Sequence, residues 1–152
     1  MAILIDTSHS MKDNHRTQLN SILDQLIDKL GVSPEGNHYA DITFDKYATI
    51  HHDLKDPLFH NLDDLKRDLN NSIFHYPKRG DWGTRADLAL DLAANQLFTP
   101  EKGDRPEIKN VLLVVTDGKQ LIAKKDKRPL IPFSNSTKLL EVGQFVFKLC
   151  PR

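Results

Sequence analysis

The run Val111-Leu112-Leu113-Val114-Val115 constrains the fold of this chain most strongly. It is apolar without interruption and rich in β-branched residues, which is typical of a central parallel strand covered on both faces. A second apolar run, Ala2-Ile3-Leu4-Ile5, predicts a short buried strand over residues 2–6. Two such strands favour an α/β fold whose helices cover both faces of a sheet.

The segments after the first run supply a helix and a hairpin. Apolar residues recur from Leu19 to Leu30 at the spacing of an amphipathic helix, and Gly31 is a suitable stop. Residues 39–44 and 48–52 predict two strands. Their short connection implies an antiparallel hairpin.

Two more helices are predicted before the second apolar run. Asn61 is a suitable N-cap for a helix that carries Asp63 and Asp64 in its first turn. Residues 85–98 predict a helix that is apolar almost all round and therefore largely buried. The order strand, helix, hairpin, helix, helix, strand predicts a three-layer, doubly wound, mostly parallel α/β sheet with one antiparallel edge strand.

The end of the chain, residues 119–152, has a weaker pattern. Lys124 to Arg128 form a basic loop, and Pro129 and Pro132 disfavour regular structure. Residues 142–149 are compatible with either a final strand or a poorly packed tail. The pattern does not decide between these two possibilities.

Composition excludes several classes of partner. Lys and Arg number 21, as do Asp and Glu, so that nothing indicates binding to nucleic acid or to a membrane surface. No apolar run approaches the length of a membrane span. The first residues lack the basic leader and long apolar run of a signal peptide. Cys150 is the single cysteine, which excludes an intrachain disulfide.

Polar residues follow the first strand at a telling spacing. Asp6, Ser8 and Ser10 stand at i, i+2 and i+4. Because alternate residues of extended backbone point the same way, one carboxylate and two hydroxyls converge where the buried strand opens into a loop. Such oxygen ligands suit a hard divalent cation.

Two distant residues can complete this site. Ligands of open α/β sheets bind at the carboxyl ends of strands, which is where Asp6 and Asp117 are expected. Thr84 lies in a glycine-containing loop before a buried helix, so that its hydroxyl can face the same edge. Two carboxylates and three hydroxyls suit Mg²⁺ that keeps some of its waters. Without a His or Cys cluster, the set disfavours zinc.

The three motifs together resemble the Asp-x-Ser-x-Ser … Thr … Asp metal-ion-dependent adhesion site of von Willebrand factor type A domains, which have a Rossmann-like fold. The segment Asp6-Thr7-Ser8-His9-Ser10, Thr84 and Asp117 carry the resemblance, and the hairpin and the strand before Asp117 agree with it. The match covers roughly residues 2–120. We therefore expect such a domain over residues 1–120 and a divergent segment over residues 121–152, as in a C-terminally truncated or divergent member.

The resemblance implies a binding module of the extracellular-matrix or collagen-associated type and not an enzyme. In such domains Ser8, Ser10 and Thr84 would be direct ligands of Mg²⁺ or Mn²⁺, whereas Asp6 and Asp117 would act mostly through bound waters. An open coordination position would accept a Glu or Asp from a protein partner, such as a matrix protein or a collagen-like chain. The family is most often extracellular, which is the localisation that the resemblance implies.

Other interpretations of these residues stay open. Asp6, Ser8 and Ser10 could be helix-capping residues, Thr84 could be the N-cap of the helix that follows it, and Asp117 could belong to a plain turn. Strand-end carboxylates with Mg²⁺ also serve phosphoryl transfer, although no phosphate-binding loop is present. A partial domain with a structural role and no ligand is the remaining alternative.

Further residues call for an explanation. Asp41 stands where the family's hairpin strand usually carries an apolar residue, so that it must be paired, neutral or at an exposed edge. Arg79-Gly80-Asp81 spells the tripeptide that integrins recognise, but such a triplet arises easily by chance. Trp82 is either a partner-contact aromatic or a local packing residue. His9 is expected to face solvent.

Overall fold

A five-stranded sheet forms the centre of the computed structural model, which describes residues 1–77, 82–117, 121–132 and, in backbone only, 143–148. The strand order is β3-β2-β1-β4-β5. The strands are β1 (Ala2–Asp6), β2 (Ala40–Phe44), β3 (Ala48–His52), β4 (Val111–Thr116) and β5 (Gly143–Lys148). The two apolar runs of the sequence are thus neighbours at the centre, as β1 and β4.

The pairing confirms the predicted class of fold. β1 pairs in parallel with β2 and with β4, whereas β3 pairs antiparallel with β2 and is an edge strand. β5 pairs in parallel with β4 from Val111↔Gly143 to Thr116↔Lys148. Of the two possibilities for residues 142–149, the strand is therefore the one adopted over residues 143–148.

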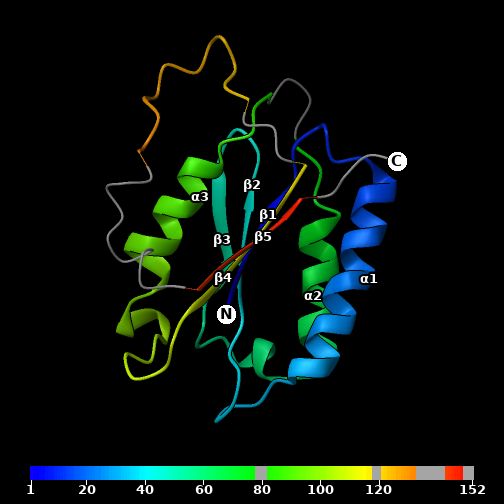
Figure 1. The fold of residues 1–152 in the computed structure, drawn as a ribbon, viewed down its shortest axis with the longest axis vertical. Helices are drawn as coiled ribbons and strands as arrows, with labels where there is room; N and C mark the ends of the chain where they lie inside the picture. The colour runs from blue at the N-terminus through cyan, green and yellow to red at the C-terminus, as the bar shows by residue number, and fades with distance from the viewer. Residues whose placement is uncertain (78–81, 118–120, 133–142, 149–152) are drawn as a thin grey trace.

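Helices cover both faces of the sheet, as Figure 1 shows. The helices α1 (Asp13–Leu30) and α2 (Leu62–Ile73) lie together on one side, and α3 (Ala86–Leu92) lies on the other. Short helical turns complete the described elements: η1 (Pro57–His60), η2 (Ala93–Leu97) and η3 (Pro100–Lys102). The result is the three-layer α/β arrangement that the sequence predicts.

Alternate residues of β1 build two separate cores. Ile3 and Ile5 pack into the cluster formed with α1 and α2, whereas Ala2 and Leu4 belong to the cluster formed with α3. All four are fully buried. Alternation along a strand places successive side chains on opposite faces, so that one short segment anchors both layers.

Two predicted helix ends are confirmed. Gly31 ends α1 with a φ of 69°, a backbone conformation that favours glycine. The side chain of Asn61 accepts hydrogen bonds from the backbone N–H groups of Asp63 and Asp64, and so caps α2.

The predicted helix over residues 85–98 differs from the observed one. Regular α-helix extends only from Ala86 to Leu92 and continues as the π-helical turn η2, in which the Phe98 N–H bonds to the Ala93 carbonyl. A π turn holds one more residue than an α turn. Both Leu97 and Phe98 are buried after it. The exposed side of α3 is also larger than expected, because Leu88 and Leu90 are only half-buried.

Asp41 is paired. Its carboxylate is fully buried in β2, and it accepts hydrogen bonds from the His52 backbone N–H (3.1 Å) and from the Ser72 hydroxyl (2.5 Å). The Nδ1 atom of His52 lies 2.8 Å from the same carboxylate. These partners offset the cost of burying a charged group.

Candidate metal site

The first loop of the candidate site begins where β1 ends, at Asp6. The Oδ1 atom of Asp6 accepts a hydrogen bond from the Ser8 backbone N–H (2.9 Å), and its Oδ2 atom accepts one from the Thr116 hydroxyl (2.7 Å). The hydroxyl oxygens of Ser8 and Ser10 lie 2.9 Å apart. The motif therefore brings a carboxylate and two hydroxyls together, as predicted, but not by the predicted alternation of extended backbone. Residues after Asp6 form a turn in which the Met11 N–H donates to the Ser8 carbonyl, and this turn makes the side chains converge.

The helix-capping interpretations are wrong. Helix α1 begins at Asp13, its N-cap residue is Lys12, and no side chain caps it. The N-cap residue of α3 is Arg85 and not Thr84, again without a side-chain capping bond. The hydroxyls of Ser8, Ser10 and Thr84 therefore do not cap the N-terminus of α1 or of α3.

The carboxylate of Asp6 lies in a demanding electrostatic environment. Burial raises the pKa of Asp6, and the negative charge of Asp117 raises it further, while hydrogen bonds from Ser8 and Thr116 oppose the shift. The anion of Asp6 is therefore less stable in this place than in water. A nearby cation would offset that cost, so the oxygen-only set fits a hard divalent ion.

Arg16 holds the first loop in place, and our sequence interpretation missed it. Its side chain is only 1% exposed. Its guanidinium donates to the backbone carbonyls of Met11 (3.0 Å) and Thr7 (2.9 Å), and also to those of Ile73, the last residue of α2, and of His75 just after it. The available signal was its position three residues before Leu19, on the apolar stripe of the helix.

Thr84 lies at the same edge of the sheet but on a separate loop. It is 3% exposed, and its backbone N–H donates to the Leu121 carbonyl (2.6 Å). The next N–H, that of Arg85, donates to the carbonyl of Asp45 (2.6 Å). Asp45 directly follows Phe44, which pairs with Asp6 in the sheet. This chain of contacts places Thr84 beside the carboxyl ends of β1 and β2.

A stacked ring pair joins the two loops. The His9 and Trp82 rings lie 4.4 Å apart between centroids, with an angle of 21° between planes. His9 faces solvent, as expected, and Trp82 remains 56% exposed. Trp82 therefore packs locally against His9 and still presents a large aromatic surface at the rim of the site.

The predicted ligands lie at the carboxyl ends of the parallel strands, but few of them are charged. Asp117 is half-buried and near enough to Asp6 to raise its pKa. Within the described ranges, no group of three or more His, Cys, Asp or Glu side chains could hold a metal. The candidate set is accordingly rich in hydroxyls, and metal binding by it stays a prediction. Gly118, the Arg79-Gly80-Asp81 triplet and Cys150 lie outside the described residues.

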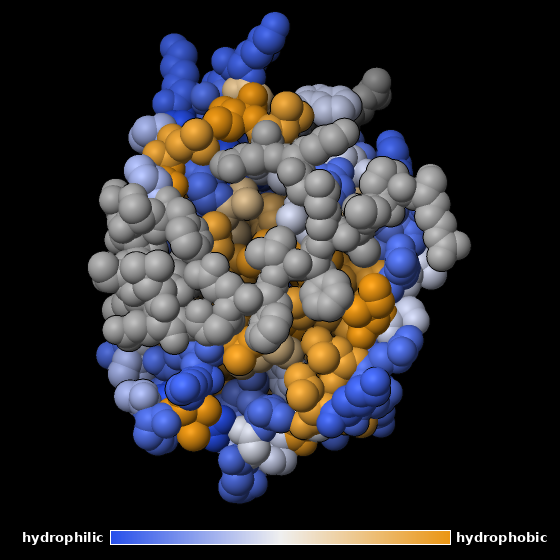
Figure 2. All heavy atoms as spheres, in the orientation of Figure 1, coloured by the Kyte–Doolittle hydropathy of each residue, from blue (hydrophilic) through white to orange (hydrophobic). Residues whose placement is uncertain are grey.

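A cavity lies at the other end of the parallel strands, beside Met1 at the start of β1 and Val111 at the start of β4. Its volume is about 540 Å³, and its mostly apolar lining includes Leu26, Leu30 and Leu113. Figure 2 shows hydrophobic side chains gathered across the middle of one face of the molecule.

No helix in the described part of the chain is long and apolar enough to cross a membrane.

The fold and the candidate metal site together define a class of protein. It is a doubly wound α/β domain with carboxylate and hydroxyl oxygens at the carboxyl ends of its parallel strands. The model of the von Willebrand factor type A domain matches residues 1–134. The chain therefore belongs to the von Willebrand factor type A domain family. The match extends past residue 120, where we expected the family resemblance to end.

Comparison with individual proteins agrees. Von Willebrand factor of Rattus norvegicus is 21% identical over 116 residues, which are 76% of this chain and 26% of that protein. The chain thus spans about a quarter of that relative.

Two solved structures show the same fold. Proximal thread matrix protein 1 from the mussel byssus, solved with a zinc-occupied MIDAS motif, superimposes with a TM-score of 0.70 at 18% identity, over 95% of this chain and 36% of that one. The vWF domain of the type V pili tip protein Mfa5 from Porphyromonas gingivalis gives a TM-score of 0.59 at 18% identity, over 77% and 36%.

Proposed function

We propose that this domain is a protein-binding module that depends on Mg²⁺ or Mn²⁺ and works in adhesion or matrix assembly. One observation carries the proposal: the Ser8 and Ser10 hydroxyls lie 2.9 Å apart beside the buried carboxylate of Asp6, and no helix uses them as caps. Type A domains generally mediate adhesion between proteins, and membership of that family supports the same conclusion.

The candidate ligands divide into two groups. As membership of the family implies, Ser8, Ser10 and Thr84 would hold the ion directly through their hydroxyl oxygens. By the same resemblance, Asp6 and Asp117 would act mostly through bound waters, and the hydrogen bonds that Asp6 already accepts from Ser8 and Thr116 are compatible with this role. A bound ion with so few anionic ligands would supply an electrophilic position for a Glu or Asp of the partner.

The surroundings of the site suit a protein partner. The exposed Trp82 ring stands on His9 at its rim, and aromatic residues often anchor protein interfaces. A hollow of about 460 Å³ beside His9, lined also by Arg16 and Tyr76, gives room for a partner segment. We propose a matrix protein or a collagen-like chain as the partner, and an extracellular location, which agrees with the byssus matrix protein among the similar structures.

Thermal unfolding tests this function. In Mg²⁺ or Mn²⁺ at 100 times the dissociation constant, the native state should gain about 2.7 kcal/mol, which corresponds to a rise in Tm of roughly 5–10 °C for a chain of this size. The double variant Ser8→Ala, Ser10→Ala should lose this rise. Ser21→Ala, on the exposed side of α1, should keep it.

The outcomes separate the alternatives. A cooperative melt with no metal-induced rise would reject the metal site and favour a domain with a structural role. Metal-dependent release of phosphate from a phosphate ester would instead favour phosphoryl transfer. A rise in Tm that survives in the double serine variant would place the metal elsewhere in the molecule.

A further inference from the structure

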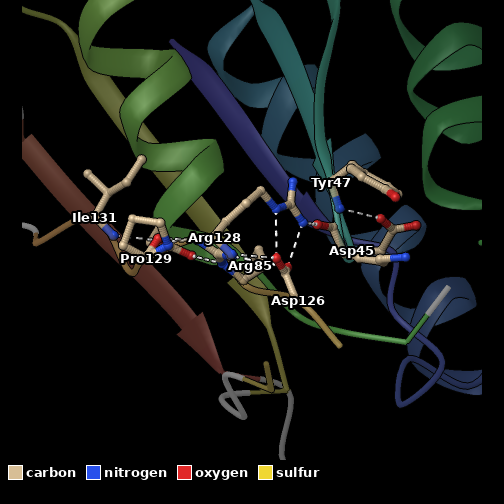
Figure 3. Close-up of polar contacts among 9 residues, drawn as sticks. Asp45, Tyr47, Arg85, Asp126, Arg128, Pro129 and Ile131 are labelled. Carbon is tan, nitrogen blue, oxygen red and sulfur yellow. Dashed lines mark hydrogen bonds and ion pairs between the residues drawn. The ribbon is translucent and has the colours of Figure 1, made fainter. Parts of the chain in front are cut away.

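The segment over residues 121–131 lies beside the loop that carries Thr84 and is fastened to that loop and its neighbours at several points. We call residues 121–131 the strap. Its Leu121 carbonyl accepts the Thr84 N–H, its Pro129 carbonyl accepts a hydrogen bond from Arg85 (2.9 Å), and its Ile131 N–H donates to Asp87 (3.1 Å). Figure 3 shows Arg85, at the start of α3, together with Pro129 and Ile131 of the strap.

A buried arginine is the centre of these contacts. The Arg85 side chain is fully buried and forms a two-pronged ion pair with Asp87, at 2.8 and 2.7 Å. Its Nη1 atom lies 3.1 Å from the carboxylate of Asp126 in the strap. The guanidinium of Arg128 contacts the same Asp126 carboxylate at 2.6 and 2.8 Å and, with that of Arg85, holds the pKa of Asp126 well below its usual value.

The strap is also attached to the β2–β3 hairpin. Arg128 donates to the Lys46 carbonyl and lies over the Tyr47 ring, 4.9 Å from its centroid. Gly83 is sandwiched there: a Cβ atom on it would come within 3.2 Å of the Lys46 Cα and 3.4 Å of the Leu121 carbonyl oxygen. The loop that carries Thr84 is thus held between the hairpin on one side and the strap on the other.

We propose that Arg85 and Asp126 form a clasp that positions Thr84 for the metal, so that closure of the strap and metal affinity are coupled. This inference rests on the proposed function. If the strap opens, the Thr84 N–H loses its acceptor, and a buried donor without a partner is costly. The loop would then relax, and the hydroxyl of Thr84 would leave the edge of the sheet.

Coupling of this kind is reciprocal. If strap closure strengthens metal binding, metal binding must stabilise the closed strap by the same factor. The chain contains its own probe of that closure. Lys124, Lys125 and Lys127 are exposed on the strap between its fastened points, and trypsin cleaves after lysine once a segment opens locally. Metal should therefore slow cleavage of the strap.

Asp126→Asn is the sharpest variant, because it removes the charge of the clasp and nearly keeps the shape of the side chain. Its matched control is Asp53→Asn, since Asp53 forms an ion pair of equal length with Lys102, also 3.1 Å, at the opposite edge of the sheet. Arg85→Lys is a second variant, which keeps the positive charge but loses the planar fork.

The experiment measures Mn²⁺ affinity by calorimetry and strap cleavage by limited trypsin digestion, with Mn²⁺ or with EDTA. In the wild-type chain, Mn²⁺ should slow the cleavage. Asp126→Asn and Arg85→Lys should weaken Mn²⁺ binding at least about fivefold and lose most of the protection, whereas Asp53→Asn should change neither. Using the ratio of rates with and without Mn²⁺ removes any effect of the substitution on trypsin itself.

The possible failures are distinct. If the wild-type chain binds no Mn²⁺, the proposed function fails and the inference falls with it. If the wild type binds Mn²⁺ and Asp126→Asn opens the strap in EDTA without weakening that binding, only the clasp is overturned. Equal weakening by Asp53→Asn would likewise overturn it, because the effect would then be one of general charge.

Discussion

Substitution of most buried residues lowers the Tm, but the environment of Asp6 predicts that Asp6→Asn does not lower the Tm of the metal-free protein. Because burial raises the pKa of Asp6, its anion is a cost to the metal-free fold. Asn at this position keeps an oxygen for the Ser8 N–H, and the Thr116 hydroxyl can turn to accept from the new amide. Asp6→Asn should therefore melt in EDTA at or above the wild-type Tm and show no metal-induced rise.

Differential scanning calorimetry with EDTA and with Mg²⁺ checks both parts. Asp13→Asn is the control, since Asp13 is an exposed acid at the start of α1, and it should keep the metal-induced rise. A full rise in Asp6→Asn would remove Asp6 from the site.

His52 makes a second residue-scale prediction, on pH. The hydrogen bond to Asp41 raises the pKa of His52 above its usual 6.5, and Asp56 and Asp68 add to this shift. A raised pKa in the folded state means that protonated His52 stabilises the fold below about pH 6.5, and that this contribution is lost as pH rises through the folded pKa. The difference in unfolding free energy between the wild type and His52→Gln should therefore be larger at about pH 6 than at about pH 8.5.

Its neighbour His51 provides a control with the opposite sign. Desolvation lowers the pKa of His51, whose ring lies 2.6 Å from the Thr43 hydroxyl. The fold then favours neutral His51, and that contribution is lost as pH falls. Urea unfolding across the same pH range should show opposite trends for His51→Gln and His52→Gln, and parallel trends would contradict the assignment.

At the scale of elements, the N-cap of α2 is the most local prediction. Asn61 satisfies the N–H groups of Asp63 and Asp64 at distances of 3.0 and 3.2 Å. Asn61→Ala should reduce the free energy of unfolding by about 1 kcal/mol, and Asn61→Asp should retain most of it. Chemical denaturation of the two variants gives this comparison, and equal stability of Asn61→Ala and the wild type would show that the cap contributes nothing.

The helices also show which local structures a sequence pattern can predict and which it cannot. Asn61 and Gly31 were predictable because a cap depends on a few neighbouring residues. The π turn after Leu92 was not, because apolar residues cover the predicted helix almost all round and their spacing does not distinguish an α turn from a wider one. Packing of Leu97 and Phe98 into the core accompanies that change.

At the scale of the whole molecule, β5 protects the sheet. It pairs along the full length of β4, whose backbone would otherwise form an open apolar edge. Such edges pair with other chains. A variant that ends at residue 132 should therefore self-associate or lose its cooperative melt, and sedimentation velocity over a range of concentrations measures this against the full chain. A monomer with the wild-type Tm would show that β5 is dispensable.

The sequence alone determined the α/β class, the hairpin and the two helix ends at Gly31 and Asn61, because these follow from periodicity and short motifs. It also predicted the residues of the candidate site, whose role as metal ligands stays a prediction. Only the tertiary structure decided that Thr116 bonds to Asp6, 110 residues away, that Arg16 joins the first loop to Ile73 at the end of α2, and that Arg85 and Asp126 fasten the strap beside Thr84. Those contacts join segments distant along the chain, and folding alone brings them together. Periodicity and short motifs relate residues that are close along the chain, and therefore do not predict such pairings.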